Sequence, residues 1–211
     1  MPDLPPVTRN LLIANLVVFL LQYFFREPLL VYGALWPLGP HQYAEGYDIG
    51  FQVWQVVTYG FMHGGWQHLL FNMLGLYMFG GVIEQTLGAR KFAIYYFVCL
   101  IVAAVAQLAV MYLFPNGFYP TLGASGAIFG VLLAFGMLYP HEKVLLFMLP
   151  VPMPAWLFVI LYAAVELFLG VTGTQAGVAH FAHLGGMVGG VVMLQYWRGK
   201  LPIKPKRRLM R

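Results

Sequence analysis

Residues 92–114 read FAIYYFVCLIVAAVAQLAVMYLF, a run of 23 residues without a charged side chain. An α-helix needs about 20 mainly apolar residues to cross the roughly 30 Å hydrocarbon core of a bilayer. The run therefore predicts a transmembrane helix. Arg90 and Lys91 precede it, as basic residues often do at the cytoplasmic end of a span.

The rest of the chain has the same apolar character. Of its 211 residues, 61% are hydrophobic and 9% are charged, whereas soluble domains carry about 25% charged residues. This composition excludes a disordered chain, a collagen, a disulfide scaffold and an ordinary soluble enzyme. The single cysteine, Cys99, permits no intrachain disulfide. The sequence predicts a polytopic membrane protein with little room for a second domain.

Five further apolar runs flank the first, at residues 11–25, 66–87, 123–139, 155–170 and 178–197. We therefore expect an all-α membrane protein, a bundle of six transmembrane helices. Residues 27–64 are rich in aromatic and polar side chains, which suits the membrane interface, so they predict a long membrane-associated loop between helices 1 and 2. Residues 1–199 form the predicted membrane domain, and residues 200–211 form a basic cytoplasmic tail.

The basic residues predict the orientation. Seven of the twelve lysines and arginines lie from Arg198 onward. Six spans put both termini on one side, and that side then holds eleven of the twelve, leaving Arg26 alone on the other. The positive-inside rule therefore places both termini in the cytoplasm. It also explains the net charge of +5 without a nucleic-acid partner, and we expect a bacterial inner membrane for so compact a core.

Two polar residues lie within the apolar runs. Burying a polar side chain in lipid costs free energy, so each of them is expected to have a structural or functional role. Ser125, the only serine in the chain, lies in LGASGA at 122–127, and His183 lies in AHFAHLGG at 179–186. Gly186 and Gly190 follow at the spacing that lets helices approach closely. Considered separately, Ser125 could simply be a small residue at a helix–helix contact, and His183 could simply make a structural hydrogen bond.

A second motif, HGGWQHLLFN at 63–72, places His68 and Asn72 four residues apart and so on one helix face. Two hydrogen-bond donors on one face suit an oxyanion hole, and they equally suit a structural polar network.

Helix rise places these residues at one depth. Ser125 and His183 each lie 15 residues before the cytoplasmic end of their run, about 22 Å, and Asn72 lies 16 residues before it, about 24 Å. All three therefore lie roughly 6–8 Å below the outer boundary. A serine, a histidine and two donors at one level predict an acyl-transfer site. His183 would act as the general base, and the Ser125 amide, His68 and Asn72 would hold the oxyanion.

The sequence offers no third catalytic residue at that depth. No aspartate or lysine lies in a span, and Glu84 and Glu166 fall at the wrong ends or depths. We therefore expect a Ser–His dyad without metal or cofactor, and we expect Glu84 to be structural. His180, one turn from His183, fits a hydrogen bond in the mouth of the site better than a catalytic role. Three alternatives remain: an inactive client-binding protein, a transporter, and a haem or metal protein using His63, His68, His180 and His183.

The three motifs, in this order on six apolar runs, resemble the rhomboid intramembrane serine proteases. The resemblance implies cleavage of single-span transmembrane proteins near the outer face, with lipid as the surrounding partner. It implies that Ser125 is the nucleophile, His183 the base, and His68, Asn72 and the Ser125 amide the oxyanion donors. It also implies a loop at 27–65 lying partly in the membrane, and lateral substrate entry gated by the fifth span together with the loop before the sixth.

Several glycines and aromatic residues would support the site. Gly123 belongs to the GASG motif, and Trp54 to the long loop. Two positions depart from the family pattern. Gln55 follows Trp54 where rhomboids often have arginine, and Phe129 stands where a tyrosine often stacks on the catalytic histidine.

Overall fold

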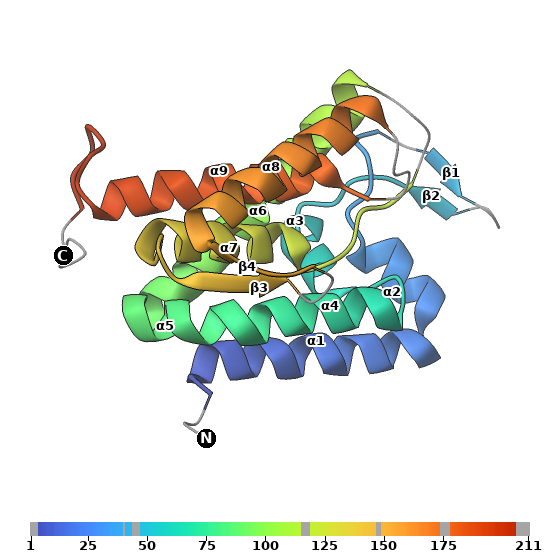
Figure 1. Cartoon of the computed structure of the whole chain (residues 1–211). Coiled ribbons are helices and arrows are strands. Elements are labelled where there is room, and N and C mark those ends of the chain that lie inside the picture. Colours follow the sequence, from blue (N-terminus) through green and yellow to red (C-terminus); the bar gives the residue numbers. More distant parts are fainter. Residues whose placement is uncertain are drawn as a thin grey trace.

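The computed structural model describes residues 4–39, 41–43, 47–114, 119–146, 149–173 and 178–205. Within these ranges the chain is predominantly helical (Figure 1). Every apolar run predicted from the sequence is helical over most of its length. The elements are α1 (Pro6–Phe24), α4 (Trp66–Gly75), the π-helical turn η2 (Leu76–Gly80), α5 (Gly81–Leu87), α6 (Ala89–Leu113), α7 (Ser125–Leu138), α8 (Ala155–Thr172) and α9 (His180–Trp197).

Three of these helices, α1, α6 and α8, are long and apolar enough to cross a membrane. The helix α7 is apolar but has only 14 residues, and the second predicted span is divided by the η2 turn. Six crossings therefore stay a prediction. The start of α1 and the end of α9 lie at the same end of the bundle, the left side of Figure 1. An even number of crossings requires this arrangement.

The two longest connections contain the only strands among the described residues, so the all-α expectation is incomplete. Between α1 and α4 lie α2 (Arg26–Gly33), a hairpin of β1 (His41–Tyr43) and β2 (Tyr47–Ile49), α3 (Gln55–Thr58) and the 3-10 turn η1 (Tyr59–Phe61). A second hairpin, β3 (Lys143–Leu146) and β4 (Leu149–Pro154), precedes α8. In a two-stranded hairpin every strand is an edge, where proline is tolerated. Part of each predicted segment, residues 40 and 44–46 of the loop and 206–211 of the tail, lies outside the described residues.

Small residues bring α9 against α6 and α7. A Cβ atom added to Gly186 of α9 would collide with the backbone carbonyl of Gly126 of α7. On the next turn, a Cβ atom at Gly130 of α7 would lie 2.9 Å from the Gly186 carbonyl oxygen. A Cβ atom at Gly190 would collide with the Tyr95 hydroxyl, which donates to the Gly130 carbonyl at 2.6 Å. The α7–α9 contact is therefore backbone against backbone.

Glu84 of α5 links its helix to the start of α1. Its carboxylate accepts hydrogen bonds from the backbone N–H of Val7 at 2.9 Å, and from the N–H and hydroxyl of Thr8 at 2.7 and 2.8 Å. These groups belong to the first turn of α1, whose N–H groups lack helical partners and favour a negative charge. The buried carboxylate therefore joins α5 to α1, a structural role.

Replacing Gly186 with alanine should destabilise the protein by about 1–3 kcal/mol or more, because the new methyl group meets backbone that has no rotamer by which to move away. The melting temperature of the purified protein in detergent measures this loss. Gly81→Ala is the matched control, since its Cβ atom would lie 3.6 Å from Pro5 Cδ, an ordinary contact. Equal melting temperatures for the two variants would contradict the packing described for α7 and α9.

Candidate active site

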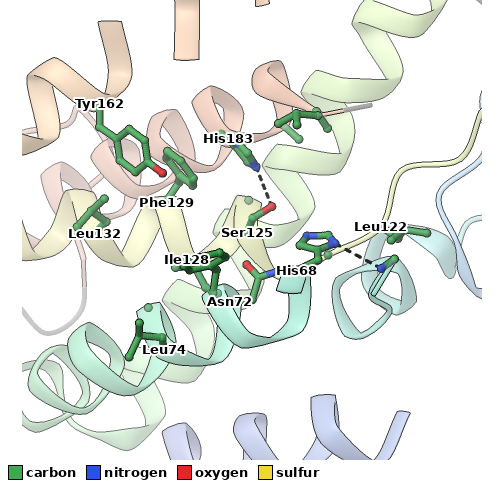
Figure 2. Close-up of a pocket in the computed structure, with 18 of the residues that line it drawn as sticks. His68, Asn72, Leu74, Leu122, Ser125, Ile128, Phe129, Leu132, Tyr162 and His183 are labelled. Atoms are coloured by element: carbon green, nitrogen blue, oxygen red, sulfur yellow. Dashed lines mark hydrogen bonds between the residues drawn. The ribbon is translucent and has the colours of Figure 1, made fainter. Parts of the chain in front are cut away.

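A cavity of about 1030 Å³ lies between α4, α7, α8 and α9. Its wall includes His68, Asn72, Ser125, Phe129, Tyr162 and His183. Figure 2 shows the side chains of His68 and Asn72 on one side of Ser125, and His183 on the other. Ser125, His183 and Asn72, which the sequence predicts at one depth, thus meet in one cavity with His68.

Ser125 is the first residue of α7, and backbone hydrogen bonds fix the segment that precedes it. Leu35 and Thr121 exchange two N–H to carbonyl bonds of 2.9 Å each, and the Gly123 N–H donates to the Tyr59 carbonyl at 2.9 Å. The Tyr59 hydroxyl in turn donates to the Leu100 carbonyl of α6 at 2.8 Å. The long loop and α6 therefore position the start of α7.

His183 approaches Ser125 from α9, one turn into that helix. Its Nε2 lies 2.8 Å from Ser125 Oγ (Figure 2). The imidazole stacks on the Phe129 ring, with centroids 4.2 Å apart and an angle of 4° between the planes. Phe129 lies one turn beyond Ser125 in α7, so one helix supplies both the hydroxyl and the surface that orients the histidine. Phenylalanine at this position therefore still stacks on the imidazole.

Glu166 of α8 also contacts His183. This contact contradicts the expectation that Glu166 lies at the wrong depth to reach the site. Its Oε2 lies 2.8 Å from His183 Nδ1 and 2.7 Å from His180 Nδ1. The side chains of Glu166, His180 and His183 are 7%, 5% and 10% exposed. A carboxylate can only accept here, so each Nδ1 bears the proton. His183 Nε2 is then the unprotonated acceptor that faces the Ser125 hydroxyl.

The expectation that excluded Glu166 is wrong because α8 runs in the opposite direction to α7 and α9. The depth of Glu166 must therefore be counted back from the C-terminal end of α8. Glu166 lies six residues before the end of α8 at Thr172, a rise of about 9 Å. That is close to the depth assigned to Ser125 and His183. Counting residues back from the outer end of the fifth run would have found it.

The tautomer of His68 follows from its neighbour Gly64. The Gly64 N–H donates to His68 Nδ1 at 3.4 Å, so the ring proton lies on Nε2. That Nε2 is next to Gly123, where an added Cβ atom would lie only 2.7 Å from it. Gly123 also has a φ of +123°, a conformation that side chains disfavour. Glycine at 123 thus gives the His68 donor access to the segment that leads into Ser125.

Asn72 presents a second donor. Its Nδ2 is buried and has no hydrogen-bond partner among the described residues. It would lie 3.7 Å from a Cβ atom at Gly123. A buried donor left unpaired is costly, so such a group calls for an explanation. An acceptor entering the cavity beside Ser125 would satisfy it.

His63 lies outside this set of donors. Its ring packs edge-on against His68, with centroids 5.1 Å apart. Burial, with a smaller contribution from His68, lowers the pKa of His63 to about 4, so it is neutral at physiological pH. The four histidines of the haem or metal alternative therefore divide into two pairs with different partners, His63 with His68 and His180 with His183.

In the described part of the chain, one group combines three residues able to ligate a metal ion. It comprises Glu166, His180 and His183, whose ligand atoms lie within 4.8 Å of one another. No spacing rule applied to the sequence would find this group, because the carboxylate lies on α8 and the imidazoles lie on α9.

The long loop is held without the arginine expected there. Trp54 is half exposed, and its Nε1 donates to the Tyr32 carbonyl at 2.9 Å. Gln55 is fully buried: its Oε1 accepts from the Trp36 N–H at 3.3 Å, and its Nε2 donates to the Val31 carbonyl at 3.4 Å. The amide of Gln55 therefore ties α2 and the segment after it to α3.

Comparison with known proteins agrees with these motifs. The family model of the Rhomboid domain matches residues 50–199. The chain belongs to the rhomboid family. It is 36% identical over 169 residues to Rhomboid protein 1, mitochondrial, of Saccharomyces cerevisiae, an alignment that covers 73% of this chain and 44% of that protein. It is 27% identical over 195 residues to Rhomboid protease GlpG of Serratia proteamaculans, covering 91% of this chain and 62% of the relative. The chain thus spans less than two thirds of the length of these rhomboid relatives.

Proposed function

We propose that this rhomboid is an intramembrane serine endopeptidase that cleaves single-span transmembrane proteins near the outer face of the bilayer. The observation that carries the proposal is the 2.8 Å contact between Ser125 Oγ and His183 Nε2, in the wall of a cavity among apolar helices. An inactive client-binding protein would have no need for this pair.

The arrangement suits acyl transfer. His183 Nε2 takes the proton of Ser125 while Oγ bonds to the substrate's carbonyl carbon. The C–N bond then breaks, the leaving amine takes the proton from His183, and an ester to Ser125 remains. Water, deprotonated by His183, hydrolyses that ester and restores the serine. No cofactor takes part in these steps.

Three donors would stabilise the oxyanion that forms in each half of the reaction. The Ser125 N–H lies in the first turn of α7, where the helix dipole favours negative charge. His68 Nε2–H and the unpartnered Asn72 Nδ2 come from α4 on the facing wall. Donors already in place are worth more in a site that excludes water.

Glu166 adds a third residue to the Ser–His pair expected from the sequence. It accepts the His183 Nδ1 proton, which fixes the tautomer needed for base catalysis and stabilises the imidazolium that forms during the reaction. We therefore propose a Ser125–His183–Glu166 arrangement in place of a dyad. Glu166 acts through His183 and is a positioning residue.

The orientation that we propose follows from the distribution of basic residues. With both termini in the cytoplasm, the cavity end of α7 and α9 lies toward the outer face, where a substrate segment leaves the membrane. Residues 1–199 would form the membrane domain and 200–211 the cytoplasmic tail. We propose the bacterial inner membrane, as expected from the compact core; the two relatives do not decide this, since the yeast mitochondrial protein is 36% identical and the Serratia protein 27%.

Ser125→Ala and His183→Ala should each abolish cleavage, because no other serine exists in the chain and no other base touches Ser125 Oγ in the described structure. The measurement is cleavage of a single-span substrate by purified protein in liposomes. His141→Ala, at an exposed histidine, is the matched control and should cut at the wild-type rate. Cleavage that persists in Ser125→Ala would end the serine-protease proposal.

His68→Ala and Asn72→Ala should each lower kcat, by about 10²–10³-fold for a donor that alone holds the oxyanion. The loss should be smaller where the Ser125 amide and the remaining side chain share the charge. Steady-state kinetics in liposomes separate kcat from KM. A double variant with unchanged kcat would assign both residues to a structural network.

Glu166→Gln should lower kcat at least about tenfold, and up to about 10⁴-fold if the amide holds the imidazole in the wrong tautomer. KM should change little, because Glu166 does not line the cavity. Glu166→Asp should recover part of the rate, since it restores a carboxylate. If all three proteins share one kcat, Glu166 serves only to pack α8 against α9.

A further inference from the structure

We propose that Glu166, His180 and His183 form a zinc site, and that bound zinc switches the protease off. The claim of inhibition rests on the proposed function. The claim of a metal site does not, because it depends only on the geometry of the three side chains.

The three groups already converge on one point. Glu166 Oε2 lies 2.7 Å from His180 Nδ1 and 2.8 Å from His183 Nδ1, and the imidazole planes are nearly perpendicular, at 88°. Tetrahedral zinc holds ligand atoms about 3.3 Å apart, given bonds of about 2.0–2.1 Å. All three ligand atoms lie within 4.8 Å of one another. A tetrahedral ion would therefore need each contact to Glu166 to open by about half an ångström and the two imidazole nitrogens to settle at the same spacing.

The chemistry of the donors selects the metal. Two imidazole nitrogens and one carboxylate oxygen form a set that zinc uses in proteins, with a fourth position left for water. Magnesium and calcium prefer oxygen ligands throughout. The site should therefore discriminate zinc from these two hard cations.

The side chain of His180 has no other evident task. Its only side-chain hydrogen bond in the described structure is to Glu166, and its Nε2 is buried without a partner. Catalysis as proposed uses His183 and Glu166 and leaves His180 idle. The imidazole of His180 is therefore available as a third metal ligand beside His183 and Glu166.

Inhibition follows from the tautomer. In the metal-free site the His183 proton lies on Nδ1 and Nε2 accepts from Ser125. Zinc bound at Nδ1 leaves the ring proton on Nε2, which then donates toward Ser125 Oγ. His183 can no longer take the serine proton, and Glu166 no longer supports the imidazole. Removal of the metal returns the proton to Nδ1 and restores the base.

The binding test uses the Ser125→Ala protein, which keeps all three ligands and cannot digest itself. Isothermal titration with zinc chloride in detergent should show one ion per chain. The double variant Ser125→Ala/His180→Ala should bind zinc at least about tenfold more weakly. A loss of about tenfold is already the lower limit for residues that only hydrogen-bond to a metal ligand. Adding His141→Ala, which removes an exposed histidine, should leave it unchanged, and magnesium chloride should give no heat of binding.

A second measurement guards against misfolding of the variant. Zinc should raise the melting temperature of Ser125→Ala, because a ligand that binds the folded state stabilises it. At the same zinc concentration the rise should be smaller in both His180→Ala and Glu166→Gln, the second of which keeps the shape of the side chain. A zinc affinity that is the same with and without His180 would overturn the site.

The activity test uses the chain with Ser125 intact. Zinc should inhibit substrate cleavage with a midpoint that matches the binding constant, and EDTA should restore the rate. In His180→Ala, the midpoint should rise by the same factor as the dissociation constant, each rate being taken relative to its own zinc-free value. Stoichiometric binding without loss of cleavage would refute the switch. A zinc-free wild type that cuts no substrate would instead count against the proposed function, while the titration still decides the metal site.

Discussion

The site depends on the contact between two backbones, α7 at Gly126 and α9 at Gly186. No side chain separates the helices there, since a Cβ atom at Gly186 would collide with the Gly126 carbonyl. Ser125 is the neighbour of one glycine, and His183 precedes the other by three residues, about one helical turn. The same contact that packs the bundle therefore sets the 2.8 Å separation between Oγ and Nε2. A larger residue at either glycine would move the hydroxyl and the imidazole apart.

Around this contact a chain of polar side chains crosses three otherwise apolar helices. It runs from Ser125 through His183 and Glu166 to His180, and each link is a hydrogen bond of 2.7–2.8 Å. A carboxylate buried among apolar side chains is costly unless it is hydrogen-bonded, and here two imidazole groups donate to it. Glu84, the other acid in the apolar helices, bonds to α1 backbone instead. One acid therefore secures the bundle while the other completes the polar chain.

The sequence predicted most of what depends on local pattern. Helices formed where the apolar runs lie. The depth estimated from the constant rise per residue of a helix placed Ser125, His183 and Asn72 at one level. It failed for Glu166, since a residue on a helix running the other way must be measured from the opposite end. The β3–β4 hairpin was missed as well, because its prolines read as a connector. Gln55 shows a further limit: only the folded loop reveals that a neutral amide reaches Trp36 and Val31.

The central claim is that the fold itself activates the single serine. The most direct measurement is covalent labelling with a fluorophosphonate probe, followed by mass spectrometry of the labelled peptide. The folded protein should carry one probe, on Ser125, and protein unfolded before the probe is added should carry none, because an isolated serine hydroxyl is a weak nucleophile. Labelling at another residue, or equal labelling of folded and unfolded protein, would contradict the claim.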